Sequence, residues 1–507
     1  MKNKILLFII IFAFVLYILT IRGIYGNPKG ASIKNNLDQA TKPFELSPER
    51  DRYILIMSLA KDRTFSLSQS LADAAYPDVG YYKRKFYIFF PPGISIIAMP
   101  FYLLGSSYNL SQVAAFSSVT LFALFNILLL FLISKNVFKL PLWISTFIPV
   151  IFAFASTSWS YAITLYQHQI TTFFILSSFY AVWNIKKNKK DSIILGAFIW
   201  FNYAFAILID YPNALLMLPV MVYYLLTSIG IKKLKSKISF NFNIAILITF
   251  LVFVVITGIH AYYNYVNFGS PTKVSSSLIG YKQIKEQNLL KEKGGQKVIQ
   301  QVQRDKNPIG FFSEQEFPFG IYELLIAPDK GIFIFSPIFV LAILGIFSVI
   351  KFMDLEKSIL LATVIAVVFL YSSWGDPWGG WAYGPRYLIP AMAPLSIFIG
   401  IFLKKYNSFI SKAITFILFA YSAAVALLGA LTTNAVPPKV EADYLKMKYG
   451  FLLNFDFLTS GRSGSFIYNQ FFANSIHLVN YYIVILLSLL ILALIILFYL
   501  PLKENEH

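Results

Sequence analysis

Residues 479–500, VNYYIVILLSLLILALIILFYL, decide the fold class. The segment contains no charged side chain, and about twenty such residues are needed for a helix to cross roughly 30 Å of hydrocarbon. Because no water in the bilayer core can satisfy open backbone groups, a run of this kind must be helical. A transmembrane barrel would show short alternating segments, and this run does not alternate.

Similar apolar runs recur along the whole chain of 507 residues. Only 13% of the residues are charged, about half of the usual fraction for a soluble domain. We therefore predict an all-α polytopic membrane protein, a bundle of about twelve transmembrane helices. The predicted spans are residues 5–25, 108–133, 142–159, 163–184, 192–209, 212–229, 243–264, 332–351, 358–374, 387–403, 412–431 and 479–500.

Lysines gather in alternate short connections between these spans, which orients the chain. With twelve spans they all fall on one side, so the positive-inside rule predicts that both termini are cytoplasmic. These lysines are Lys2, Lys4, Lys135, Lys139, Lys186, Lys187, Lys189, Lys190, Lys232, Lys233, Lys235, Lys237, Lys351, Lys357, Lys404, Lys405, Lys412 and Lys503. Three long segments, 26–107, 265–331 and 432–478, then lie outside a cytoplasmic membrane, together with most of the acidic residues.

The net charge of +19 fits this orientation and contact with anionic lipid better than nucleic-acid binding. The absence of cysteine excludes disulfides and thiol catalysis. We expect residues 1–431 to form one transmembrane module, followed by an outer loop and a final helix in 432–507. Within the flexible outer loop 265–331, residues 281–306 are rich in Lys, Gln and Glu and are typical of a mobile, solvated flap.

The first long segment contains two predicted interfacial helices. Ser47 and Pro48 are typical of a helix start, with Ser as N-cap and Pro at the first helical position. The apolar spacing that follows predicts an amphipathic helix on the membrane surface. Residues 94–104, after a Pro-Pro-Gly break, predict a second interfacial or re-entrant helix.

Acidic and basic residues alternate at the start of the first of these helices, in Glu49-Arg50-Asp51-Arg52-Tyr53. In one interpretation the acids only meet the positive end of the helix dipole. In the other, Glu49 or Asp51 is a general base just above the bilayer.

Residues 374–387, WGDPWGGWAYGPRY, form the most unusual stretch. Its aromatic residues are partly explained by the interfacial aromatic belt, but four Gly and two Pro indicate a tight loop whose backbone approaches something closely. Arg386, at the mouth of a span, needs an anionic partner, and a lipid phosphate is a natural one. The alternative is ordinary anchoring to lipid headgroups.

Two further outer positions attract attention. Asp210 lies near membrane depth and is a functional candidate, although an Asp before a Pro turn also has a structural reason to be there. His168 lies at an outer span end, and no spacing of histidines indicates a metal site. No nucleotide-binding, zinc-protease or serine-hydrolase motif is present.

Taken together, these motifs resemble GT-C glycosyltransferases. The segment 49–53, followed by Tyr81-Tyr82, Phe86-Tyr87, Phe90-Pro91-Pro92-Gly93 and residues 100–105, is similar to the first outer region of the protein O-mannosyltransferase and aminoarabinose transferase groups. The motifs at 268–271, 328–331, 336–337 and 379–387 resemble a less characterised bacterial and archaeal branch.

The resemblance implies transfer of a sugar from a polyprenyl-phosphate donor outside the cytoplasmic membrane. It places the catalytic acid in a modified D-x-D pattern, at Glu49 by comparison with the aminoarabinose transferases and at Asp51 by comparison with the other branch. Where the aminoarabinose transferases have a lysine before Pro-Pro, this chain has Phe90, so Lys85 or Arg84 would supply that charge. Gln167 and His168 stand where those enzymes have a second acid.

The resulting hypothesis is an inverting transfer to a hydroxyl of a lipid, glycan or protein, with the carboxylate as general base. Arg386, with Lys85 or Arg84, would bind the donor phosphate. Aromatic and histidine side chains would contact substrate, namely Tyr53, Tyr82, His168, Trp378, Trp381, Tyr383 and Tyr387. No cofactor is required, although an E-x-D pair can bind a divalent metal. The alternatives are a flippase or transporter of lipid-linked sugars, or an inactive scaffold subunit.

Overall fold

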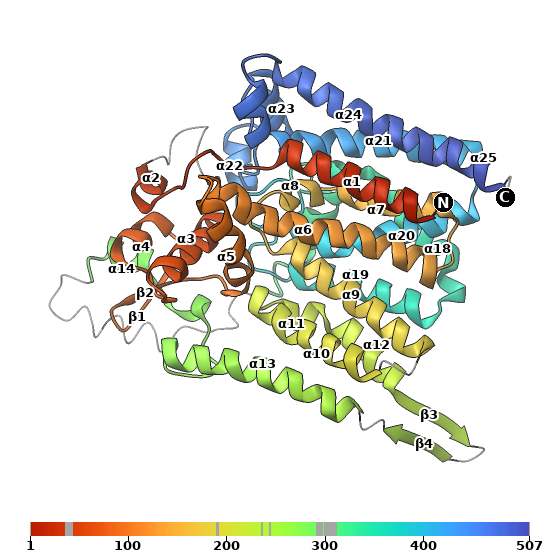
Figure 1. Cartoon of the computed structure of the whole chain (residues 1–507), viewed down its shortest axis with the longest axis horizontal. Coiled ribbons are helices and arrows are strands. Elements are labelled where there is room, and N and C mark those ends of the chain that lie inside the picture. Colours follow the sequence, from red (N-terminus) through yellow and green to blue (C-terminus); the bar gives the residue numbers. More distant parts are fainter. Residues whose placement is uncertain are drawn as a thin grey trace.

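The computed structural model describes residues 2–35, 44–188, 192–234, 237–242, 245–289, 298 and 312–505. Long helices run in one general direction, and both termini lie at the same end of the bundle (Figure 1). Several short helices and one of the two small sheets gather at the opposite end, which we call the distal end. Termini at one end are what an even number of spans requires.

Helices form most of the described chain. They are α1 (Lys2–Thr20), α2 (Gly30–Asn35), α3 (Ser47–Lys61), α4 (Gln69–Ala75), α5 (Gly93–Ser106), α6 (Ser111–Leu132), α7 (Leu142–Phe154), α8 (Ser158–Ala162), α9 (His168–Lys187), α10 (Ser192–Ile209), α11 (Asn213–Leu216), α12 (Leu218–Ser228), α13 (Ala245–Phe268), α14 (Tyr281–Glu286), α16 (Phe317–Leu325), α17 (Ile332–Phe335), α18 (Val340–Val349), α19 (Leu355–Ser372), α20 (Ile389–Lys405), α21 (Phe409–Leu431), α22 (Lys439–Tyr444), α23 (Phe451–Thr459), α24 (Leu478–Leu494) and α25 (Leu500–Asn505).

In the described part of the chain, 8 helices are long and apolar enough to cross a membrane. These candidate spans are Asn3–Thr20, Ser111–Val137, Ser192–Ile209, Leu247–Phe268, Leu355–Ser372, Arg386–Lys405, Phe409–Leu431 and Leu478–Lys503. Shorter apolar helices lie at Gly93–Ser106, Leu142–Phe154, Asn213–Ser228 and Pro337–Phe352. The predicted helical, multi-pass membrane fold is thus confirmed, whereas a count of about twelve spans stays a prediction.

Two small antiparallel sheets add to the helices and were not predicted. At the distal end the strand order is β2 (Lys85–Ile88), β1 (Val79–Tyr82) and β5 (Ile279–Gly280). Gly80 pairs with Tyr87 on one side and with Gly280 on the other, so this sheet joins the first long segment to the second. The other sheet is the hairpin of β3 (Ile229–Leu234) and β4 (Lys237–Phe242).

The structure modifies the prediction for α3. Its N-cap is Leu46 rather than Ser47, and Ser47 instead donates a hydrogen bond to the Asp78 carboxylate. Residues 49–58 are all buried, so the helix does not present one exposed face as the predicted surface helix would. The reason is that α4, α5 and β2 pack around it. The second predicted helix is α5, which begins directly after Pro92.

The predicted flap, residues 281–306, lies mostly outside the described residues. Its described beginning is α14, where the Tyr281 hydroxyl donates a hydrogen bond of 3.0 Å to Asp73 and accepts one of 2.6 Å from Gln69. Tyr281 is buried. This part of the predicted flap is therefore anchored on α4.

Glycine permits the close crossing of α18 and α20. A Cβ atom on Gly345 would overlap the backbone carbonyl of Phe398, an atom that cannot move out of the way as a side chain can. A Cβ atom on Gly258 of α13, in contrast, would meet nothing within 4 Å. The two positions therefore make a matched pair.

We predict that Gly345→Ala destabilises the protein by about 1–3 kcal/mol, because overpacking forces the two helices apart. Gly258→Ala should change stability by less than about 1 kcal/mol, in the stabilising direction, since Ala is the better helix former. Thermal unfolding of both variants in the same detergent checks this. Equal unfolding temperatures for the two variants would contradict the packing of α18 on α20.

Candidate functional site

A cavity of about 870 Å³ lies at the distal end. The segment before α3 and its first turn form one side, and the α10–α11 turn and the stretch 374–387 form others. Its lining residues are Glu45, Leu46, Ser47, Pro48, Arg50, Pro77, Asp78, Phe89, Phe90, Pro91, Asp210, Tyr211, Pro212, Leu215, Val274, Ser276, Phe312, Trp374, Asp376, Gly379, Gly380, Trp381, Arg386 and Tyr387. A volume of this size accommodates a medium-sized organic ligand.

The cavity combines apolar walls with charges of both signs. Two guanidinium groups line it, from Arg50 and Arg386. The lining carboxylates are Glu45, Asp78, Asp210 and Asp376. A site of this composition can hold an anion and a base next to an apolar group.

Arg386 is placed by aromatic rings and by a tight glycine turn. Its guanidinium carbon lies 5.5 Å from the Tyr166 ring centre and 5.3 Å from that of Tyr387. The backbone of Gly379 adopts a φ of 75°, and a Cβ there would come within 3.1 Å of the Arg386 Nε. The predicted close backbone approach in this stretch is therefore an approach to Arg386. Its Nε has no hydrogen-bond partner among the described residues.

The second arginine of the cavity is already engaged. Arg50 donates hydrogen bonds of 3.3 and 2.7 Å to the carbonyls of Ala75 and Tyr76, and its Nε lies 3.3 Å from Asp51. Arg386 is thus the better placed of the two to receive an additional anion.

Asp210 is held at the cavity wall by a chain of polar contacts. Its carboxylate accepts a hydrogen bond of 3.1 Å from Gln167, whose own carbonyl accepts one of 2.9 Å from the buried Arg52. Burial raises the pKa of Asp210 to about 6, against the opposing charge of Arg52. Gln167, the predicted substitute for a second acid, therefore positions an acid that comes from another segment.

Asp376 lies in the loop that carries Arg386. Its Oδ1 has no hydrogen-bond partner in the described part of the chain. Burial raises the pKa of this carboxyl, while the backbone of Gly380 and the charges of Arg386 and Lys330 lower it. A hydrogen bond from the buried Lys330 ammonium to the carbonyl of Ala382 also holds this loop in place.

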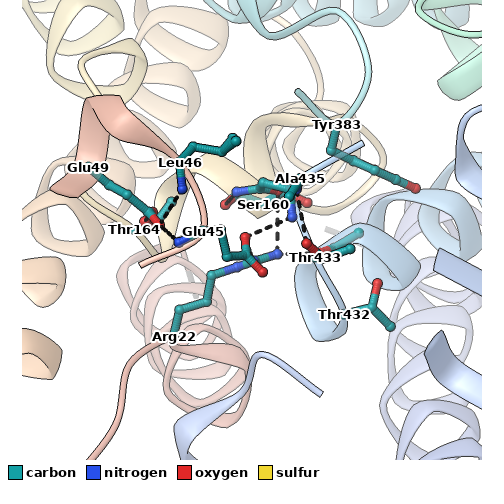
Figure 2. Close-up of polar contacts among 12 residues, drawn as sticks. Arg22, Glu45, Leu46, Glu49, Ser160, Thr164, Tyr383, Thr432, Thr433 and Ala435 are labelled. Atoms are coloured by element: carbon teal, nitrogen blue, oxygen red, sulfur yellow. Dashed lines mark hydrogen bonds and ion pairs between the residues drawn. The ribbon is translucent and has the colours of Figure 1, made fainter. Parts of the chain in front are cut away.

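Glu49 lies behind the cavity wall. One carboxylate oxygen accepts the backbone N–H of Glu45 at 2.7 Å, and the other accepts a hydrogen bond from Thr164 (Figure 2). Burial and the charge of Glu45 raise the pKa of Glu49 to about 7. In this conformation Glu49 caps α3 and does not line the cavity.

Asp51, two residues further along α3, is fully buried. One of its oxygens pairs with Arg50, and the other has no partner among the described residues. Burial raises the pKa of Asp51 well above its ordinary value, despite the Arg50 charge. Like Glu49, it is one layer removed from the cavity.

A partly buried ion pair fixes the segment before α3. Arg22 pairs with Glu45 (Figure 2). The same carboxylate oxygen accepts the backbone N–H of Asn434 at 2.8 Å. Arg22 also donates to the carbonyl of Gly429 at 2.6 Å. The ends of α1 and α21 thereby hold one side of the cavity in place.

The predicted substrate-contacting residues separate into groups. Trp381 and Tyr387 line the cavity, together with Arg386. Three others are buried and do not line the cavity. The Tyr53 hydroxyl forms a hydrogen bond of 2.6 Å with Ser111, and the Tyr383 hydroxyl donates one of 2.5 Å to the Val425 carbonyl. The His168 ring packs against Tyr161. Trp378 packs on Phe319.

The remaining predicted residues lie in the β1–β2 hairpin. Arg84 and Lys85 are exposed there, and Arg84 adopts a φ of 64° in the turn. The ammonium of Lys273 lies 4.4 Å from the centre of the Tyr82 ring. None of the three lines the cavity.

Two carboxylates that line the cavity were not predicted from the sequence. Glu45 and Asp78 are single acids without a motif, and their positions follow from contacts with Arg22 and Ser47 that the local sequence does not reveal. In the described part of the chain, no three His, Asp or Glu side chains are grouped to hold a metal ion.

No protein-family model matches the sequence, and no curated protein matches it either. Solved structures are similar. ArnT from Cupriavidus metallidurans in the apo state is 14% identical, with 97% of this chain and 77% of that chain covered and a TM-score of 0.48. ArnT from Cupriavidus metallidurans bound to undecaprenyl phosphate is 15% identical, with 96% and 76% covered and a TM-score of 0.52. At such identities the similarity shows the fold alone, and this chain shares the overall fold of ArnT.

Proposed function

We propose that this protein is a membrane glycosyltransferase that moves a sugar from a polyprenyl-phosphate donor to a hydroxyl of a lipid, glycan or protein. One observation carries the proposal: the distal cavity places Arg386 and several carboxylates against apolar walls. The ArnT structure with undecaprenyl phosphate supports a lipid-phosphate ligand for this fold.

Arg386 is proposed to bind the donor phosphate, because its fork of N–H donors matches phosphate oxygens. The unpartnered Nε and the aromatic rings beside it leave the guanidinium oriented but able to accept an anion. The polyprenyl chain of the bound donor would extend out of the cavity along apolar lining residues such as Phe90 and Leu215. Arg84 and Lys85 would contribute only if the β1–β2 hairpin moves toward the cavity.

The proposed chemistry is a direct displacement. A carboxylate removes the proton of the acceptor hydroxyl, whose oxygen bonds to the anomeric carbon while the bond from that carbon to the phosphate oxygen breaks. Polyprenyl phosphate leaves as a stable anion beside Arg386, so it needs no added proton. Attack from the face opposite the leaving group inverts the anomeric configuration. The proton stays on the carboxylate until it exchanges with water.

Three acids compete for the role of the base. The sequence favours Glu49 or Asp51, and Glu49 adjoins the backbone of the cavity residue Glu45. Geometry adds Asp210, which lines the cavity directly. Asp51 is the weakest of the three, since it is buried against Arg50.

The distal end is proposed to face away from the cytoplasm, with both termini inside a cytoplasmic membrane. The short connections at the end of the termini carry the lysine clusters, which the positive-inside rule assigns to the cytoplasm.

Purified protein in nanodiscs should transfer label from one member of a panel of radiolabelled polyprenyl-phosphate sugars to an envelope acceptor fraction. We expect the transfer rate to fall by a factor of about 10²–10⁴ in the variant that lacks the base, Glu49→Gln or Asp210→Asn. A base must be deprotonated, so the wild-type rate should rise with pH through about 7 for Glu49 or about 6 for Asp210.

Asp443→Asn is the matched control, because this acid lies in α22, outside the cavity lining. Donor binding without transfer to any acceptor would favour a flippase or scaffold. Full activity in the Glu49, Asp51 and Asp210 variants together would exclude all three of these acids as the base.

Arg386→Gln should weaken donor binding and lower the transfer rate by at least tenfold, because one charged hydrogen bond to phosphate is worth about 1.5–3 kcal/mol. Arg462→Gln removes the same charge from an exposed arginine beside Phe457 and should have no effect. Binding of polyprenyl phosphate measured by isothermal titration in detergent tests both. Equal affinities would remove Arg386 from the donor site.

The orientation is testable because the chain has no cysteine of its own. We expect a membrane-impermeant maleimide to label Arg84→Cys on intact cells and to leave Lys351→Cys unlabelled until the cells are opened. The reverse pattern would place the cavity on the cytoplasmic side.

A further inference from the structure

A second cavity, of about 660 Å³, lies at the end of the bundle where both termini are found. It is formed where the segment after α6, the start of α7, the α20–α21 connection and α25 come together (Figure 1). Four ammonium groups line it, those of Lys135, Lys139, Lys404 and Lys412. No acidic side chain appears among its described lining residues.

Two lysines of this cavity contact a carbonyl and an aromatic ring. Lys404 donates to the carbonyl of Lys139 at 3.4 Å, and Lys412 lies 4.8 Å from the ring centre of Trp143. Within the described chain, no ion pair with a carboxylate is formed by Lys139, Lys404 or Lys412. Like charges around one cavity repel each other, so an anion within it would be stabilised by all of them.

The rim of the same cavity is apolar and faces outward. Phe409 is 75% exposed and Leu502 is 63% exposed, and both line the cavity beside Phe498. These residues belong to candidate membrane spans, so hydrocarbon is their natural neighbour. The cavity therefore joins a cationic interior to a lipid-facing apolar edge.

We propose that this cavity binds the headgroup of an anionic phospholipid, with an acyl chain lying along Phe409 and Leu502. Lysine is a common phosphate ligand that acts as a point charge, and basic pockets between membrane helices suit acidic headgroups. The apolar rim is what favours a lipid over free phosphate. This inference is independent of the proposed transfer reaction, because the two cavities lie at opposite ends.

The test uses the full-length protein in nanodiscs of phosphatidylcholine that contain a small fraction of phosphatidylglycerol. After extraction into detergent, native mass spectrometry counts the phosphatidylglycerol that each protein retains. The variant is Lys139→Gln/Lys404→Gln/Lys412→Gln. The control, Lys4→Gln/Lys351→Gln/Lys405→Gln, removes the same charge from exposed lysines that do not line the cavity.

Wild type and control should retain phosphatidylglycerol in preference to phosphatidylcholine, and the cavity variant should lose at least tenfold in that preference. Should the triple variant fail to fold, Lys404→Gln is compared with Lys405→Gln, since these neighbours differ in lining the cavity. Equal retention by variant and control would overturn the proposal. Displacement of the lipid by millimolar inorganic phosphate would also overturn it, because the apolar rim would then contribute nothing.

Discussion

The buried guanidinium of Arg22 is the constraint on which the distal end depends. It is 3% exposed at the end of the first membrane helix, where an unpaired cation is strongly disfavoured. Glu45 supplies the counter-charge, and the carbonyl of Gly429 supplies a further acceptor. Removing one partner of such a pair typically costs about 3–5 kcal/mol. Three chain segments that are distant in sequence are thereby fixed to one another.

The start of α3 follows from this pairing. Glu45 is held by Arg22, and its backbone N–H is accepted by Glu49, so the first turn of α3 begins at a defined place beside the cavity. Two layers of carboxylates result. Asp210 and Asp376 line the cavity. Glu49 and Asp51 are buried and do not line it, and their burial raises their pKa values.

Sequence reasoning predicted what local patterns encode. Apolar runs placed the membrane helices, Pro92-Gly93 placed the start of α5, and the glycines of 374–387 indicated the close approach around Arg386. Features that depend on long-range contacts were missed. The strand pairing of Gly80 with Gly280 and the burial of α3 on all sides need partners from elsewhere in the chain. Glu45 has no local signal at all.

The two ends of the bundle differ in charge, which separates the two proposed sites. The distal cavity mixes two arginines with four acids, a composition compatible with the proposed proton transfer. The cavity near the termini is lined by lysines without acids among its described residues. The most direct test of the distal site is a structure of the protein in a lipid nanodisc with polyprenyl phosphate. We expect the phosphate within hydrogen-bonding distance of the Arg386 guanidinium, between Asp210 and Trp381. A bound phosphate elsewhere, with the distal cavity empty, would contradict the proposed donor site.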